Sequence, residues 1–235
     1  MILHEDASFK IYFGDIKDDC VKSDGNYNID YFEKIGSILN LEKLVFLKQV
    51  HGNSGVCVDQ NFLEKNTALF ELNGDYIVTN KRNIGIGVLT ADCLPVIFYD
   101  PVHHASGIIH SGWRGAISNI IENCVEKMKE LYQTNTKDLT VYFGACANVC
   151  CYEIQADFLK NLETISFFED VIIKKEDKMF FDLSKLVAMK LIELGVLRQE
   201  INFSYNNCTI CDERFHSYRR NQGGVGRQST IISLK

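Results

Sequence analysis

The stretch ADCLPVIFYDPVHHASGIIHSGWRGA (residues 91–116) decides the fold. It contains two short, continuously apolar segments, LPVIFYD (94–100) and ASGIIH (105–110), with a more polar turn between them. Apolar segments of this length, bounded by turn-forming residues, predict β-strands that are covered on both faces. Hydrophobic packing does not explain Cys93 in front of the first segment or His110 at the end of the second, so both residues are candidates for chemistry.

Other apolar segments along the chain predict the remaining strands, because they are rich in β-branched residues and are bounded by Gly, Asn and Asp. They are LVFLKQV (44–50), DYIVTN (75–80), IGIGVLT (84–90), LTVYFG (139–144), VIIKK (171–175), INFSY (201–205) and STIISL (229–234).

Helices are predicted where apolar residues recur three and four positions apart. These regions are IDYFEKIGSIL (29–39), residues 117–131, YEIQADFLKNLETI (152–165) and a segment that follows Asp182 as its N-cap. The chain has only two prolines and no linker-like stretch. We therefore expect an α/β fold in which helices cover mixed sheets, built as a single domain over residues 1–235.

The composition excludes several classes of function. The 235-residue chain has a net charge of −6 and no long basic block, which argues against general binding of nucleic acids or anionic membranes. Its N-terminus, MILHEDASFK, does not have the pattern of a secretory signal, and its apolar runs are too short to cross a bilayer. Nine cysteines in such a chain predict a reducing cytoplasm, where thiols are free, catalytic or bound to a metal.

Three residues at strand–loop junctions form a candidate metal site. His51 lies in KQVHGN (48–53), and Cys93 and His110 flank the two central segments. Two imidazoles and a thiolate suit Zn²⁺, and three protein ligands leave a fourth position open, as in catalytic zinc sites. The alternative is that the histidines are hydrogen-bonded scaffold residues and that the cysteine only fills space.

The Gly-Trp-Arg-Gly turn at 112–115 is a candidate anion site. A strand that runs through glycines into a helix exposes backbone N–H groups, and Arg114 can add bidentate contacts to a phosphate. The alternative is a tight strand-to-helix connection in which Trp113 is a packing residue. A further arginine cluster near the C-terminus is either solvated or contributes to the same cleft; it comprises Arg214, Arg219, Arg220 and Arg227.

Two other groups of cysteines have competing interpretations. Cys146, Cys150 and Cys151 lie in GACANVCCYEI (144–154), and Cys208 and Cys211 form the CxxC of NCTICDE (207–213). Together they could form a tetrathiolate zinc site or a redox pair. Adjacent cysteines rarely bind one metal comfortably, which favours free thiols lining a turn before a helix.

These segments, in this order, resemble the YfiH-like family, also called the laccase-domain or polyphenol oxidoreductase family of purine nucleoside phosphorylases. The motifs that carry the resemblance span residues 45–228 and include KQVHGN, GVLTADCLPVIFYD, HSGWRGA, GACANVCCYEI and CTICDERFHSYRRNQGGVGRQ. Two departures are Ser111, where alanine is usual, and GACANVCC, which replaces a turn with glycine and proline.

The resemblance implies a layered α/β/β/α fold and zinc held by His51, Cys93 and His110. It also implies phosphorolysis of adenosine, inosine, guanosine and methylthioadenosine to the free base and ribose 1-phosphate or methylthioribose 1-phosphate, together with deamination of adenosine. Alongside Cys93 and His110, we hypothesise that Asp92 handles a proton or supports the ligands, although it could equally be a turn residue. Phosphate contacts are hypothesised for four residues: Gly112, Arg114, Gly115 and Arg220.

Three alternatives are carried forward. A copper-dependent polyphenol oxidase would need more histidines for a multicopper site than the six present, although copper at the proposed site is possible. A cysteine hydrolase would use Cys93 as nucleophile and His110 as base. A non-enzymatic binding protein would hold a structural metal. The expected assembly is a monomer or a homodimer.

Overall fold

Side chains along the central strand β7 (Leu94–Asp100) face two different cores. Leu94, Val96 and Phe98 contribute to one core, and Ile97 and Tyr99 contribute to another. All seven residues of this strand are buried. The continuous apolar sequence therefore reflects a strand that is covered on both faces, as predicted.

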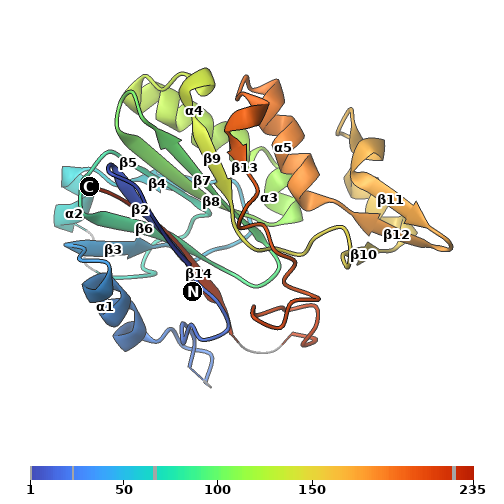
Figure 1. The fold of residues 1–235 in the computed structure, drawn as a ribbon, viewed down its shortest axis with the longest axis horizontal. Coiled ribbons are helices and arrows are strands. Elements are labelled where there is room, and N and C mark those ends of the chain that lie inside the picture. Colours follow the sequence, from blue (N-terminus) through green and yellow to red (C-terminus); the bar gives the residue numbers. More distant parts are fainter. Residues whose placement is uncertain (1, 23, 66–67, 224–225) are drawn as a thin grey trace.

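The computed structural model describes residues 2–22, 24–65, 68–223 and 226–235. Within these residues the strands form three sheets, two of them large and mixed. The five-stranded sheet has the order β1 (Ile2–Glu5), β2 (Phe9–Phe13), β14 (Gln228–Leu234), β6 (Ile84–Thr90) and β3 (Lys43–Phe46). The six-stranded sheet has the order β13 (Ile201–Asn202), β9 (Thr140–Phe143), β7, β8 (Ala105–Ser111), β5 (Tyr76–Thr79) and β4 (Gly55–Cys57). The small sheet, with the order β10 (Glu153–Ile154), β12 (Lys178–Phe181) and β11 (Ile172–Lys175), lies at one end of the molecule (Figure 1).

Helices cover the outer faces of the two large sheets. Helix α1 (Ile29–Ile38) packs Phe32 and Ile35 against the five-stranded sheet. The six-stranded sheet is covered by three helices, α3 (Trp113–Ile117), α4 (Ile120–Tyr132) and α5 (Leu183–Glu193). The inner faces of the sheets meet in a core that includes Ile86 and Ile97. The order of layers is α/β/β/α, as the resemblance implied (Figure 1).

The remaining elements are short. They are α2 (Gln60–Lys65), η1 (Thr136–Asp138), η2 (Ala156–Asn161), η3 (Phe168–Val171) and η4 (Arg198–Glu200), where η marks 3₁₀ helices. None of the helices in the described ranges has the length and apolar character needed to cross a membrane.

Two helix predictions are wrong in detail. The predicted helix at 117–131 is divided into α3 and α4, because Asn119 adopts a left-handed φ of 67° between them. The predicted helix at 152–165 is instead β10 followed by η2. Its first residues pair with β12, while Phe158, Leu162 and Ile165 still pack into the core. The spacing of these apolar residues does place them on one buried side, but short 3₁₀ turns achieve this as well as an α-helix does.

The other helix predictions are confirmed. The segment at 29–39 forms α1, and Asp182 caps α5 by accepting a hydrogen bond from the backbone N–H of Lys185 at 2.8 Å. Five strands were not predicted, namely β1, β2, β4, β10 and β12.

Candidate metal centre and cavity

Both Cys93 and His51 lie where the chain crosses from the five-stranded to the six-stranded sheet. Residues 91–93 connect β6 to β7, and the segment around His51 connects β3 to β4. His110 lies in β8, where it pairs with Pro95 of β7. The register of β7 and β8 therefore brings His110 close to Cys93, and the second crossover brings His51 to the same edge.

A single buried carboxylate, Asp75, fixes two parts of this site. It accepts hydrogen bonds from the backbone N–H groups of His51 at 3.0 Å and Gly52 at 2.7 Å. The Oδ1 that accepts from His51 also forms a hydrogen bond with Nδ1 of His110 at 2.8 Å. Because Nδ1 of His110 is engaged, Nε2 is left for a metal, which is the usual arrangement of a ligating histidine and its supporting carboxylate.

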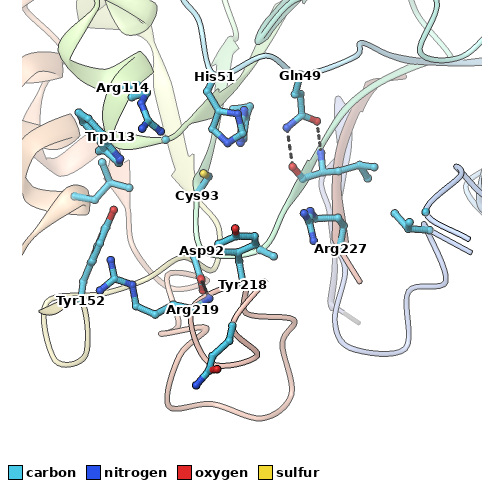
Figure 2. A pocket seen from close by; sticks show the side chains of 18 of the residues that line it. Gln49, His51, Asp92, Cys93, Trp113, Arg114, Tyr152, Tyr218, Arg219 and Arg227 are labelled. Carbon is cyan, nitrogen blue, oxygen red and sulfur yellow. Dashed lines mark hydrogen bonds between the residues drawn. The ribbon is translucent and has the colours of Figure 1, made fainter. Parts of the chain in front are cut away.

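A second set of hydrogen bonds, from the side chain of Gln49, holds the segment around His51 against β6. The side-chain amide of Gln49 donates to the carbonyl of Leu89 at 2.7 Å and accepts from the N–H of Leu89 at 2.8 Å. Figure 2 shows these two bonds beside His51. The left-handed φ of 60° at His51 is thus held by Asp75 on one side and Gln49 on the other.

The three predicted ligands converge. The donor atoms of His51, Cys93 and His110 all lie within 4.8 Å of one another. His110 is buried, Cys93 is half-buried and His51 is exposed, so the cluster has one open side. A Cβ on Gly112 would lie 3.0 Å from the sulfur of Cys93, and only glycine leaves that space free. The donor set, its spacing and the fixed His110 ring fit a divalent ion with three protein ligands.

Within the cluster, burial and charge interactions shift the pKa values of the side chains in opposite directions. Burial raises the pKa of the Cys93 thiol, but the charge and hydrogen bond of His110 and the hydrogen bond of His51 lower it to about 6. Burial lowers the pKa of His110, but Cys93 and Asp75 raise it to about 9. Burial raises the pKa of Asp75, but His110 and the amides of Gly52 and His51 hold it below its usual value. Without a metal, the cluster is therefore a thiolate–imidazolium pair supported by a carboxylate.

This pair should make the stability of the metal-free protein depend on pH. The contribution of Cys93 is lost as the pH falls through about 6, and that of His110 is lost as the pH rises through about 9. Stabilisation by the pair is therefore expected between these values. Urea unfolding of chelator-treated protein below, within and above this window measures it, with Cys93→Ala as reference. A difference between the two proteins that does not change with pH would contradict the pairing.

The open side of the cluster faces a cavity of about 950 Å³, within the size range of small-molecule sites. Its walls carry aromatic and cationic side chains (Figure 2). The aromatic residues are Tyr27, Trp113, Tyr152 and Tyr218, and the arginines are Arg114, Arg219 and Arg227. The guanidinium of Arg114 lies over the ring of Trp113, 4.4 Å from its centroid.

Two of the four predicted phosphate contacts, Gly112 and Arg114, line the cavity, and the other two do not. Gly115 is buried, and a Cβ there would lie 2.9 Å from the carbonyl oxygen of Gly52, so this glycine allows two turns to pack closely. Arg220 donates to the carbonyls of Thr209 and Phe215 at 2.7 and 2.6 Å, so its guanidinium braces a loop.

Asp92 also lines the cavity, but its carboxylate is already engaged. One oxygen accepts from the hydroxyl of Thr209 at 2.6 Å, and the other accepts from the backbone N–H of Arg219 at 2.7 Å. Asp92 therefore ties the ligand-bearing crossover to the C-terminal loop. The carboxylate that contacts a candidate ligand is Asp75, for which the sequence predicted only a place at the start of a strand.

The cysteines of the two other groups are free thiols that form no disulfide, as the sequence favoured, but they do not lie before a helix. Four of them, Cys150, Cys151, Cys208 and Cys211, form a second group whose sulfur atoms lie within 4.8 Å of one another. The segment after Cys151 is a strand rather than a helix. Cys146 is buried separately, where it contacts the hydroxyl of Ser184 at 3.3 Å.

Known proteins resemble this chain over most of its length. The model of the family described as multi-copper polyphenol oxidoreductase laccase matches residues 23–235. A purine nucleoside phosphorylase of Clostridium acetobutylicum is 30% identical over 98% of this chain and 94% of its own length. Another, of Bacillus subtilis, is 29% identical over 93% of this chain and 79% of its own length.

Solved structures show the same fold. The hypothetical protein YfiH of Bacillus licheniformis aligns with a TM-score of 0.84 and 23% identity, over 97% of this chain and 93% of that chain. The layers, the ordered motifs and the family match agree with one another. The chain belongs to the multi-copper polyphenol oxidoreductase laccase family, and its relatives from Clostridium acetobutylicum and Bacillus subtilis are named as purine nucleoside phosphorylases.

Proposed function

We propose that the protein is a zinc-dependent purine nucleoside phosphorylase that also deaminates adenosine. The observation that carries the proposal is the convergence of His51, Cys93 and His110 on one side of a cavity of about 950 Å³. The names of the relatives support it. The proposed substrates are adenosine, inosine, guanosine and methylthioadenosine, with phosphate as the second reactant.

The residues around the cluster suit the chemistry of a metal site. When held by His51, Cys93 and His110, zinc supplies Lewis acidity and, for deamination, a bound water of lowered pKa. Asp75 keeps the His110 ring oriented and its Nδ1 engaged, so the ring cannot rotate away from the site. Gly112 leaves the space beside the Cys93 sulfur open.

Phosphorolysis joins a phosphate oxygen to C1′ of the ribose while the bond from C1′ to the purine nitrogen breaks. The main demand on the protein is to hold phosphate and nucleoside in line, which supplies several kcal/mol of the rate enhancement. We assign the phosphate contacts to Arg114, Arg219 and Arg227, which line the cavity, in place of Arg220, which does not. One nitrogen of Arg219 donates to the carbonyl of Glu153 and one of Arg227 to that of Gly226, so their other N–H groups are the ones assigned to phosphate. The N–H groups of the first turn after Gly112 can add to them.

The flat purine is proposed to bind against the aromatic walls. Trp113 and Tyr152 lie on one side of the cavity, and Tyr218 lies near Asp92 (Figure 2). Tyr218 is 55% exposed, so its ring can stack on a flat ligand.

The deciding experiment follows inosine with and without phosphate. Release of hypoxanthine together with ribose 1-phosphate, only when phosphate is present, is expected. The same assay with adenosine and no phosphate should give inosine if deamination occurs. Hydrolysis to free ribose would contradict phosphorolysis.

Replacing Arg114 by alanine is expected to raise the KM for phosphate roughly 10- to 100-fold, the range for losing one hydrogen bond to a charged group. The effect on nucleoside KM should be smaller, because the nucleoside contacts are assigned to other side chains. Arg198→Ala is the matched control, since Arg198 is exposed in η4 and does not line the cavity. Equal changes in both variants would remove Arg114 from the phosphate site.

A cysteine hydrolase is the second candidate, because Asp75, His110 and Cys93 also have the order of a carboxylate, a base and a nucleophile. Such an enzyme would be indifferent to chelators and to phosphate, and a thiol alkylator would block it. His51 has no part in a triad of this kind, and its place in the cluster favours the metal enzyme. Copper content with oxygen consumption on a phenol would instead identify an oxidase.

A further inference from the structure

Four thiols outside the cavity lie at the spacing of metal ligands. The sulfur atoms of Cys150, Cys151, Cys208 and Cys211 are all within 4.8 Å of one another, and those of Cys150 and Cys211 are 3.9 Å apart. Four thiolates arranged tetrahedrally at about 2.3 Å from a zinc ion lie about 3.8 Å from one another. A disulfide would need sulfur atoms about 2.0 Å apart. The observed spacing therefore matches a shared ion more closely than a covalent pair.

The backbone holds the two cysteine-bearing segments together independently of the thiols. Cys146 and Cys208 form a parallel β-bridge. The N–H of Cys146 donates to the carbonyl of Asn207 at 3.0 Å, and the N–H of Thr209 donates to the carbonyl of Cys146 at 2.9 Å. The pairs 150–151 and 208–211 are thus brought face to face by main-chain contacts.

Tight turns direct the side chains of each pair to one point. The N–H of Cys151 donates to the carbonyl of Asn148 at 2.9 Å, and the N–H of Asp212 donates to the carbonyl of Cys208 at 3.0 Å. The first turn allows adjacent cysteines to present both sulfur atoms to the same place. The CxxC turn is the usual half of a structural zinc site.

The Cys208 sulfur lies among backbone N–H donors. These donors are the backbone amides of Asn148, Ile210 and Cys211. Amide donors of this kind stabilise a thiolate, which is the form that binds metals.

We propose that Cys150, Cys151, Cys208 and Cys211 bind a second zinc ion through four thiolates. Four protein ligands close the coordination shell, so this ion is structural and takes no substrate. The proposal uses none of the residues of the cavity and does not depend on the proposed function.

The second ion would brace one wall of the cavity. Thr209, within the CxxC segment, donates to one oxygen of Asp92, and the N–H of Arg219 donates to the other. Arg220 binds carbonyls of the same segment. The tetrathiolate group is thus connected to the loop that carries Tyr218 and Arg219 into the cavity.

Metal analysis of purified variants separates the two sites. The wild-type protein is expected to contain about two zinc ions per chain, one for each donor set. Cys211→Ser, a change at an exposed thiol, should lose one ion and keep the other, and Cys93→Ala should lose only the other. Cys57→Ser is the matched control, because Cys57 belongs to neither group, and it should keep both.

X-ray absorption at the zinc edge of Cys93→Ala protein tests the ligands without a change in the second site. Four sulfur neighbours at about 2.3 Å are expected. Fewer than three sulfur neighbours would overturn the proposal, as would wild-type protein in which the only zinc is lost with Cys93. A mass lower by two hydrogens, with two of the four thiols unreactive, would show a disulfide and overturn it as well.

Discussion

Replacing Cys93 by alanine is expected to remove the catalytic zinc and to lower kcat/KM for inosine by roughly 1000-fold, because a metal ion contributes several kcal/mol to stabilising the transition state. The change removes the only thiolate of the cluster and leaves His51 and His110. Two imidazoles hold zinc less tightly than the full set of three ligands. The fold should persist, since Cys93 is only half-buried and is followed by a strand with its own core contacts.

Zinc content, phosphorolysis and the thermal transition should be measured on the same preparation. Cys57→Ser is again the control, because Cys57 lies in β4 and its sulfur contacts the Tyr132 hydroxyl. Unchanged activity and unchanged zinc content in Cys93→Ala would refute the metal enzyme. Loss of activity with full zinc retention would point to the thiol as a nucleophile.

Replacing Asp75 by asparagine is expected to weaken zinc binding roughly 10- to 100-fold, the usual effect of losing the partner of a ligating histidine. Asparagine is similar in shape, but it removes the charge and offers one oxygen where Asp75 serves the amides of His51 and Gly52 and the ring of His110. Buried donors lose their acceptor, so the free energy of unfolding should also fall by about 3 kcal/mol.

Competition with a chelator gives the zinc affinity, and urea unfolding gives the stability. Asp92→Asn is the matched variant, because its carboxylate contacts Thr209 and Arg219 rather than a candidate ligand. It should keep its zinc and change the KM values instead. If Asp92→Asn lost zinc affinity and Asp75→Asn kept it, Asp92 would be the carboxylate that supports the metal ligands.

Local sequence patterns predicted the parts of the fold that depend on near neighbours. The segments at 84–90 and 94–100 became strands at those positions because continuous apolar sequence has a direct meaning in a strand covered on both faces. Asp182 capped α5 because an N-cap acts within three residues. The segment at 152–165 is not an α-helix, because its first residues pair with β12 and the rest forms 3₁₀ turns.

Contacts between distant segments could not be read in the same way. Asp75 is 24 residues from His51 and 35 from His110 along the chain, and nothing beside it distinguishes it from any acidic residue before a strand. Its role depends on the amides of His51 and Gly52 and on the imidazole of His110, which only the fold brings around it. Arg220 shows the opposite error, because its position beside other arginines suggested a ligand contact, whereas its guanidinium binds main-chain carbonyls.

Two of the crossovers between the large sheets, β3 to β4 and β6 to β7, each carry one residue of the three-donor cluster. Because His51 and Cys93 lie on different crossovers, a shift of one sheet relative to the other would change the distance between them. Metal coordination by the cluster therefore depends on how the two large sheets pack against each other. Substitutions that disturb the apolar core between the sheets are expected to weaken metal binding before any strand unfolds.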